Sequence, residues 1–210
     1  MTPPRLSIRW AGGDLAAVLE GYGVDIGGGI VELASARIEL ERAGRPAGLP
    51  QLDVDELPSS AGPAAASSAV IDVAAVGWAT VDIDRADAHV AAGVGAASSP
   101  AARDGLLGAT VRRSTGRRPE QLLLEPDTEG RLAGALARYG EGPAVVYLRV
   151  PDLEGIAARL TTGLTTGLTT RRGDGPLGPA RLILGGPPAG PFLILVGPAP
   201  SGFDRVPSDP

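Results

Sequence analysis

The 210-residue chain contains no cysteine, and aromatic residues make up only 3% of it. Without cysteine the chain can form no disulfide, offers no thiolate nucleophile and holds no cysteine-ligated zinc. This absence fits a reducing compartment, and we expect the protein in the cytoplasm. Hydrophobic residues, 43% of the chain, suffice for a sizeable core, but with so few aromatics that core must consist of Ala, Val, Leu and Ile.

A basic stripe, which binding to a phosphate backbone requires, is also absent. The net charge is −5 and the isoelectric point is about 4.9. The densest basic cluster, Arg112, Arg113, Arg117 and Arg118, has no aromatic neighbours for base stacking, and we interpret it as a solvated hairpin. We therefore expect no nucleic-acid partner.

Long apolar runs are missing as well. No run approaches the roughly 20 residues that a membrane-spanning helix needs. The N-terminus lacks the basic-then-apolar pattern of a signal peptide. We therefore expect no membrane partner. The richness in Ala, Gly, Pro and Arg, with Arg in place of Lys, is typical of a GC-rich bacterial genome.

Glycine (31 residues) and proline (20 residues) are abundant and predict many turns and loops. They gather with Ala and Ser in residues 43–69, which we interpret as a linker with a short ordered piece around 52–57, and in a tail, residues 199–210. Two further segments are predicted to be irregular: the low-complexity loop 161–170 and a turn at 172–174.

The rest of the chain repeats itself. Val76–Asp87 and Val146–Ala157 each read as a short apolar strand, an Asp followed by Ile or Leu, and a helix, and Leu6–Ala17 is a fainter copy. The aspartates that align are Asp14, Asp82 and Asp152.

Local signals define the helices and strands. Asp152 can cap the free N–H groups of the turn that follows, and apolar residues then recur at i, i+3, i+4 and i+7 from Leu153 to Leu160. A further helix is predicted within 128–140, ended by Gly140. Candidate strands are bounded by Gly and Pro residues. They lie at 29–31, 36–40, 107–112, 121–125, 180–184 and 192–196.

This order of elements predicts an α+β fold of paired βαβββ modules. Two such modules side by side form a curved, cup-like sheet with the helices outside. The modules are residues 70–127 and 143–198, joined by the helix at 128–140. Residues 1–42 form a degenerate N-terminal half-module of strand, helix and strand.

Two stretches carry a family resemblance. They are Leu122-Leu-Leu-Glu-Pro-Asp-Thr-Glu-Gly-Arg-Leu-Ala133 and Arg138-Tyr-Gly-Glu-Gly-Pro-Ala-Val-Val-Tyr-Leu-Arg-Val-Pro-Asp152-Leu. They resemble the vicinal-oxygen-chelate (VOC) superfamily, which includes glyoxalase I, methylmalonyl-CoA epimerase, extradiol dioxygenases and bleomycin-resistance proteins. Epimerase-like members carry a Leu-Leu-Glu-Pro strand end, a helix, Gly-Glu-Gly and then a strand opening with His. The resemblance covers residues 70–198 and implies a glyoxalase-like domain with a cup-shaped site.

In that family a divalent metal sits in the cup, held by His or Glu on the first strand of each module and Glu on the last. The equivalent first-strand positions here are Ala75 and Val145, which are not ligands. Glu125 matches a last-strand ligand, but its counterpart in the second module is aliphatic. With three of the four implied ligands missing, we expect no bound metal cofactor, because one carboxylate does not retain a hard cation. Metal binding by another route is left open.

Strand alternation predicts which side chains line the cup. The expected lining residues are Ala75, Gly77, Leu123, Glu125, Val145, Tyr147 and Arg149. Small residues on one wall should leave room for a ligand. Arg149 can bind a carboxylate or phosphate, and Glu125 can act as a base if desolvation raises its pKa. The alternative is a plain ion pair between Glu125 and Arg149.

Three functions stay open, in this order. The first is a metal-free cup that binds a small organic molecule, as in the bleomycin-resistance proteins that the chain resembles. The second is a VOC-type enzyme, a lyase, an isomerase or a related dioxygenase, with Glu125 as base or metal ligand and Tyr147 or Arg149 holding an oxyanion. The third is a non-catalytic interaction module whose N-terminal half-module pairs with another chain. A homodimer is also left open.

Overall fold

The computed structural model describes residues 6–10, 13–40, 52–56, 71–94, 98–114, 119–162, 168–184 and 191–198. Within them the chain forms four helices and two β-sheets, one of four strands and one of eight, so the predicted α+β class is confirmed. No helix in this part of the chain is long and apolar enough to cross a membrane. The predicted tail, 199–210, lies outside the described residues.

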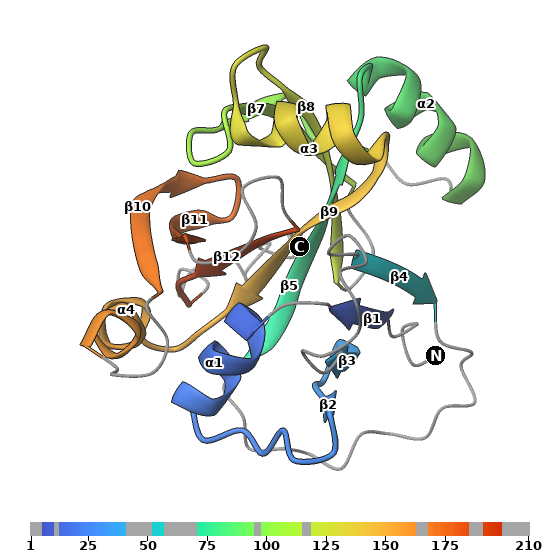
Figure 1. Cartoon of the computed structure of the whole chain (residues 1–210). Coiled ribbons are helices and arrows are strands. Elements are labelled where there is room, and N and C mark those ends of the chain that lie inside the picture. The colour runs from blue at the N-terminus through green and yellow to red at the C-terminus, as the bar shows by residue number, and fades with distance from the viewer. Residues whose placement is uncertain are drawn as a thin grey trace, which may run out of the picture.

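The eight-stranded sheet consists of two βαβββ modules, as the repeat predicts (Figure 1). The first module comprises β5 (Asp72–Ala79), α2 (Ile83–Val94), β6 (Ala102–Asp104), β7 (Ala109–Ser114) and β8 (Glu120–Pro126). The second comprises β9 (Gly142–Arg149), α4 (Leu153–Thr162), β10 (Thr169–Gly175), β11 (Gly178–Leu184) and β12 (Phe192–Val196), and α3 (Arg131–Tyr139) joins the two.

The strand order is β10-β11-β12-β9-β5-β8-β7-β6. The first strands of the two modules, β5 and β9, pair antiparallel at the centre. Each also has a parallel neighbour, β8 beside β5 and β12 beside β9. The sheet curves until its edge strands, β6 and β10, contact one another. The result is a nearly closed barrel that surrounds one interior.

Strand β10 corrects two expectations. It occupies residues that the sequence analysis assigned to the end of the low-complexity loop and to the turn at 172–174. Its polar, glycine-containing sequence lacks apolar alternation because it is an edge strand with little surface to bury.

The N-terminal part forms its own sheet, with the order β2-β3-β1-β4. Its elements are β1 (Leu6–Trp10), α1 (Gly13–Gly21), β2 (Ile30–Glu32), β3 (Ala36–Leu40) and β4 (Leu52–Glu56). The short ordered piece expected around 52–57 is confirmed as β4, which pairs antiparallel with β1 and so belongs to this sheet and not to a linker. The other residues of 43–69 lie outside the described part of the chain. We keep the name half-module for β1 to β4 with α1.

Aspartate side chains start the helices of both modules. Asp152 Oδ1 accepts the N–H of Gly155 at 2.8 Å, which confirms the predicted cap of α4. Asp82 Oδ1 accepts the N–H of Arg85 at 2.9 Å and caps α2 in the same way. Asp14, the third aligned aspartate, lies inside the first turn of α1 and has a different role, because its carboxylate is buried.

One apolar core joins the half-module to the outer face of the barrel. Val76 of β5 and Val146 and Leu148 of β9 belong to the same buried cluster as Ile8 and Trp10 of β1. Apolar residues of α1 and α4 complete this cluster, and the two helices lie beside each other (Figure 1). The half-module is therefore packed against its own chain.

Candidate functional site

The interior of the barrel is lined by a buried apolar cluster with members from β5, β7, β8, β9, β11 and β12. Residues from six strands can meet only on the concave side of the sheet. Ala75, Val145 and Tyr147 belong to this cluster and have 0% exposed surface. These three predicted lining residues therefore lie inside, and whether they bind a ligand stays a prediction.

Gly77 also faces the interior, but the space beside it is filled. A Cβ atom added at Gly77 would lie 2.6 Å from Cδ1 of Leu124 and 3.0 Å from Cβ of Val145. The expectation that small residues leave room for a ligand is wrong at this wall, because Leu124 occupies the room. A ligand at this position would have to displace side chains.

Glu125 does not face the interior. Leu122 and Leu124 belong to the interior cluster, and successive side chains of a strand point to opposite faces, so Leu123 and Glu125 point outward. Glu125 Oε2 accepts the N–H of Ile83, the first residue of α2, at 2.9 Å. The prediction that Leu123 and Glu125 point inward is therefore wrong. The inward-facing positions of β8 are shifted by one residue, and a shift of one residue moves every side chain to the other face of the sheet.

Arg149 lies far from Glu125. Arg149 pairs with Asp72 at one end of β5, whereas Glu125 follows Leu124, which pairs with Ala79 at the other end. Seven residue steps of about 3.3 Å separate the two ends, roughly 23 Å. Arg149 Nη1 instead donates to the carbonyl oxygen of Gly197 at 3.3 Å. The expected pairing of these two residues, as a site or as an ion pair, is wrong.

Among the described residues, Tyr147 and Asp104 form a buried polar pair in the interior. The Tyr147 hydroxyl donates to Asp104 Oδ2 at 2.9 Å, and Asp104 Oδ1 accepts the N–H groups of Leu106 and Leu107 at 2.9 and 3.1 Å. Burial, together with the nearby Asp104 carboxylate, raises the pKa of Tyr147 well above its usual value. Tyr147 is thus a neutral phenol whose proton is already donated. Tyr147 was predicted from the sequence and Asp104 was not, because a lone Asp at the end of a short strand carries no signal of its own.

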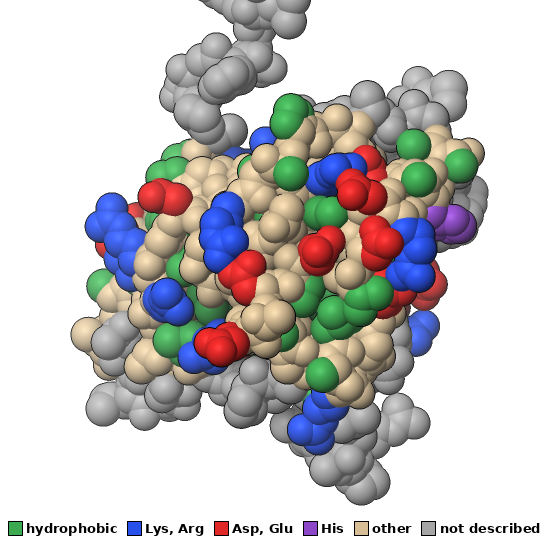
Figure 2. Space-filling view, turned by 90° about the horizontal axis from the view of Figure 1, so that it is seen from above, with side chains coloured by type: hydrophobic (Ala, Val, Ile, Leu, Met, Phe, Trp, Pro, Cys, Tyr) green, Lys and Arg blue, Asp and Glu red, His purple; other side chains and the backbone are tan. Residues whose placement is uncertain are grey.

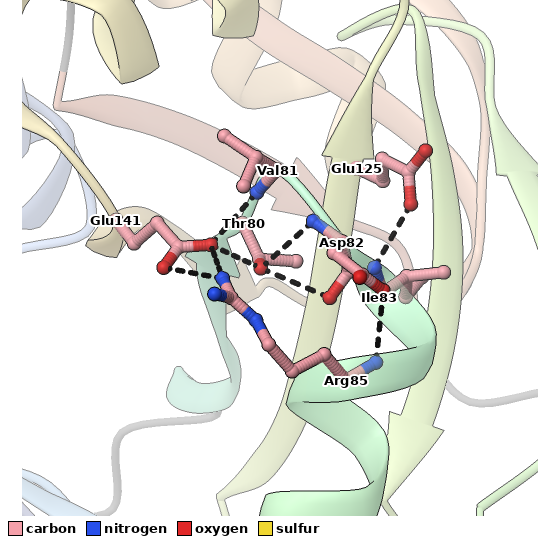
Figure 3. Close-up of polar contacts among 7 residues, drawn as sticks. All are labelled: Thr80, Val81, Asp82, Ile83, Arg85, Glu125 and Glu141. Carbon is pink, nitrogen blue, oxygen red and sulfur yellow. Dashed lines mark hydrogen bonds and ion pairs between the residues drawn. The ribbon is translucent and has the colours of Figure 1, made fainter.

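A second polar cluster lies outside the barrel, where β5 passes into α2 (Figure 3). Glu141 Oε1 accepts hydrogen bonds from the Thr80 hydroxyl at 2.6 Å and from the Val81 N–H at 2.9 Å, and its carboxylate pairs with Arg85 at 2.7 Å. These contacts, the Thr80 hydroxyl first, hold the pKa of Glu141 below its usual range. Glu141 is the glutamate of the Gly-Glu-Gly motif, and its role could not be predicted from the sequence.

Both glutamates of the family-like motifs therefore bind the same turn. Glu125 belongs to β8 and Glu141 directly precedes β9, and each accepts a backbone N–H of the segment 81–83. Free N–H groups at a helix N-terminus attract negative charge. The geometry thus accounts for both motif glutamates as anchors of α2.

The residues at the family's metal positions do not fit a cation. Ala75 and Val145 carry no donor atom and are packed among aliphatic side chains. Both oxygens of the interior carboxylate of Asp104 already accept hydrogen bonds. Among the described residues, no group of three or more His, Asp or Glu is arranged to hold a metal ion. We therefore derive no step through a metal.

The surface above the barrel carries both signs of charge. Figure 2 shows arginine and acidic side chains interspersed on this face. Among the described residues, ion pairs join Arg85 to Glu141, Arg103 to Asp127, and Arg112 to Asp84 and Asp87. Such paired charges form no continuous basic area on the part of this face that the structure describes.

Solved structures with a similar fold include methylmalonyl-CoA epimerase from Mycobacterium tuberculosis, at 22% identity and a TM-score of 0.54, covering 64% of this chain and 93% of that chain. A variant of the Streptomyces coelicolor methylmalonyl-CoA epimerase in complex with 2-nitronate-propionyl-CoA matches at 19% identity and a TM-score of 0.51, covering 61% of this chain and 95% of that chain. A hypothetical protein from Bacillus halodurans matches at 15% identity and a TM-score of 0.50, covering 61% and 95%.

No family profile and no curated protein matches the sequence. At these low identities the structural likeness shows the fold alone. The barrel of this chain has the VOC fold, in agreement with the resemblance seen in its motifs.

Proposed function

We propose that this chain is a VOC-fold binding protein that takes up a small apolar organic molecule in its interior, without a metal and without transforming it. The observation that carries the proposal is the pair of buried apolar residues, Ala75 and Val145, at the positions where the family holds its metal. Apolar surface of this kind favours apolar ligands.

The placement of the acidic groups supports binding over catalysis. A general base must lie within hydrogen-bond reach of the proton that it removes, and Glu125 lies on the outer side of the sheet, bound to the N-terminus of α2. Tyr147 is engaged with Asp104. The lyase or isomerase alternative with Glu125 as base therefore loses its geometric support.

The chemical class of the ligand follows from the lining. In the part of the chain that the structure describes, leucine, valine and alanine side chains dominate the interior, and the Tyr147–Asp104 pair is buried among them. We expect an apolar molecule with one hydroxyl or amine that can join this pair. The epimerase neighbours bind CoA esters, which supports an organic ligand on this fold but does not name the ligand here.

The interaction-module alternative has weaker support. The apolar side of the half-module is buried against its own chain. Its sheet also carries a row of charges, in which Arg9 lies 3.6 Å from Glu39, and Arg37 lies 3.4 Å from Glu39 and 3.7 Å from Glu32. A charged, internally paired row of this kind offers little apolar area to another protein.

A fluorescence titration with 1-aminoanthracene, an apolar aromatic amine, tests the proposal. Wild type should bind one molecule per chain. Leu124→Ala should bind about tenfold more tightly, because the vacated space beside Gly77 accepts apolar atoms.

Leu148→Ala is the matched control. This leucine is equally buried but belongs to the outer cluster, so the variant should bind like wild type. The proposal is overturned if wild type binds neither this probe nor an alcohol series from butanol to octanol, even if Leu124→Ala binds them. Metal analysis of the purified protein is the companion measurement, and a stoichiometric divalent metal would also overturn the proposal.

A further inference from the structure

The barrel closes along one line that differs from all its other strand contacts. Neighbouring strands from β10 round to β6 are joined by backbone hydrogen bonds, whereas β6 and β10 are the two ends of that order and, in the residues described, share no ladder. We call this line the seam. It lies between residues 104–106 of the first module and 173–176 of the second.

Side chains hold the seam together. The Leu106 side chain lies so close to Gly173 that a Cβ added there would be 2.7 Å from Leu106 Cδ2 and 3.0 Å from Cγ. Arg113 Nη1 donates to the carbonyl oxygen of Pro176 at 3.5 Å, while its other nitrogens bind Glu120 at 2.9 Å. In the described residues, an apolar contact and a long hydrogen bond thus stand where the other strands share ladders of backbone bonds.

The polar pair of the interior lies directly behind the seam. A Cβ added at Gly175 would be 3.8 Å from Asp104 Oδ2, the atom that accepts the Tyr147 hydroxyl. Asp104 also holds the turn that presents Leu106. A displacement of β10 and β11 away from β6 would therefore uncover the Tyr147–Asp104 pair and Leu106 first.

Two other routes into the interior are more firmly closed. The remaining strand contacts are ladders that would have to break. One end of the barrel is covered by α3, whose Leu132 and Ala135 are buried in the interior cluster (Figure 1).

We propose that the β10–β11 hairpin is a gate, and that ligands reach the interior by separation of the hairpin from β6 along the seam. This inference rests on the proposed binding function, and it adds the route and the moving part.

A disulfide across the seam tests the gate. In Leu106→Cys/Gly173→Cys the leucine that would clash with a new Cβ is removed, and the chain has no other cysteine to interfere. Stopped-flow association with 1-aminoanthracene should slow by at least about tenfold in the oxidised variant and recover on reduction. The control is Asp174→Cys/Pro179→Cys, which links facing residues within the hairpin itself and should leave the rate unchanged. Thiol titration verifies that each disulfide has formed.

The outcomes separate the two proposals. Wild-type rates in the oxidised seam variant would overturn the gate and leave the binding function standing. Absence of binding in the wild type and in all reduced variants would overturn both. If the seam disulfide does not form, Gly173→Ala gives a second test. The new Cβ would press on Leu106, weaken the seam and speed association severalfold. An unchanged rate would overturn the gate.

Discussion

The phenol of Tyr147 donates a hydrogen bond of 2.9 Å to Oδ2 of Asp104, and neither residue has any exposed surface. The bond joins β9 of the second module to the end of β6 in the first. Inside an apolar interior, a polar group left without its partner is costly. This pair therefore ties the two modules together.

Tyr147→Phe should lower the free energy of unfolding by about 1–3 kcal/mol, because Asp104 loses one hydrogen-bond donor while staying buried. Urea unfolding measures the change. Tyr139→Phe, a matched change on the surface of α3, should have little effect. Equal stability of the two variants would contradict a stabilising role for the pair.

The same tyrosine predicts a loss of stability in alkali. The pKa of Tyr147 is raised well above its usual value in the folded protein, so this phenol contributes stability that is fully present below about pH 10 and lost as the pH rises further. Wild type should therefore lose more stability above pH 10 than Tyr147→Phe does. If the free energies of unfolding of the two proteins fell equally with rising pH, the Tyr147 phenol would not be the cause of the loss.

Glu141 predicts a loss of stability in acid. Its pKa is lowered in the folded protein by the Thr80 hydroxyl, the Val81 N–H and Arg85. Its contribution is therefore present above the unfolded pKa and lost as the pH falls through the folded value. Glu141→Gln should reduce stability at pH 7. When the melting temperature is measured over a series of acidic pH values, it should also fall less steeply with decreasing pH in this variant than in wild type. Glu129→Gln, a change at an exposed carboxylate, should leave this dependence on pH as in wild type.

Gly77→Ala should destabilise the protein by about 1–3 kcal/mol, because the new Cβ would lie 2.6 Å from Leu124 in a packed interior. Combining it with Leu124→Ala should give a loss smaller than the sum of the two single losses, which a double-mutant cycle measures. Gly134→Ala, at an α3 position with nothing within 4 Å, should instead stabilise slightly through helix propensity. Additive losses at 77 and 124 would show that the two side chains do not compete for space.

Asp14 predicts the opposite pH response to Glu141. Burial raises the pKa of Asp14, although the Trp10 indole donates to it at 2.9 Å. A carboxyl with a raised folded pKa loses stability as the pH rises from its unfolded pKa of about 3.9 through the folded value. Asp14→Asn keeps an acceptor for Trp10 and should remove this loss, as measured by tryptophan fluorescence in urea at pH 4 and pH 7. An unchanged pH dependence would contradict this role.

The sequence predicts the architecture well because local signals agree with it. The repeated strand, aspartate and helix recur in both modules, and Asp152 caps α4 as predicted. Gly140 ends α3 with a φ of 79°, a conformation that suits glycine. Strand β10 escapes prediction because its polar edge composition hides it.

The candidate site is predicted less well, for a physical reason. The run Leu122-Leu-Leu124 is apolar in both alternation phases, so the sequence alone cannot decide which face of β8 is inside. The wrong phase put Glu125 in the interior and Leu124 outside it. The partner of Tyr147 could not be found from sequence either, since Asp104 is brought to it only by closure of the barrel.

The core shared by the half-module and the barrel has a practical meaning for domain dissection. A fragment beginning at residue 71 would expose Val76, Val146 and Leu148 to solvent on one face of its sheet. A contiguous exposed apolar surface of this kind promotes aggregation. The half-module alone would expose Ile8 and Trp10 in the same way. Either fragment alone should therefore precipitate on expression unless its exposed apolar residues are replaced by polar ones.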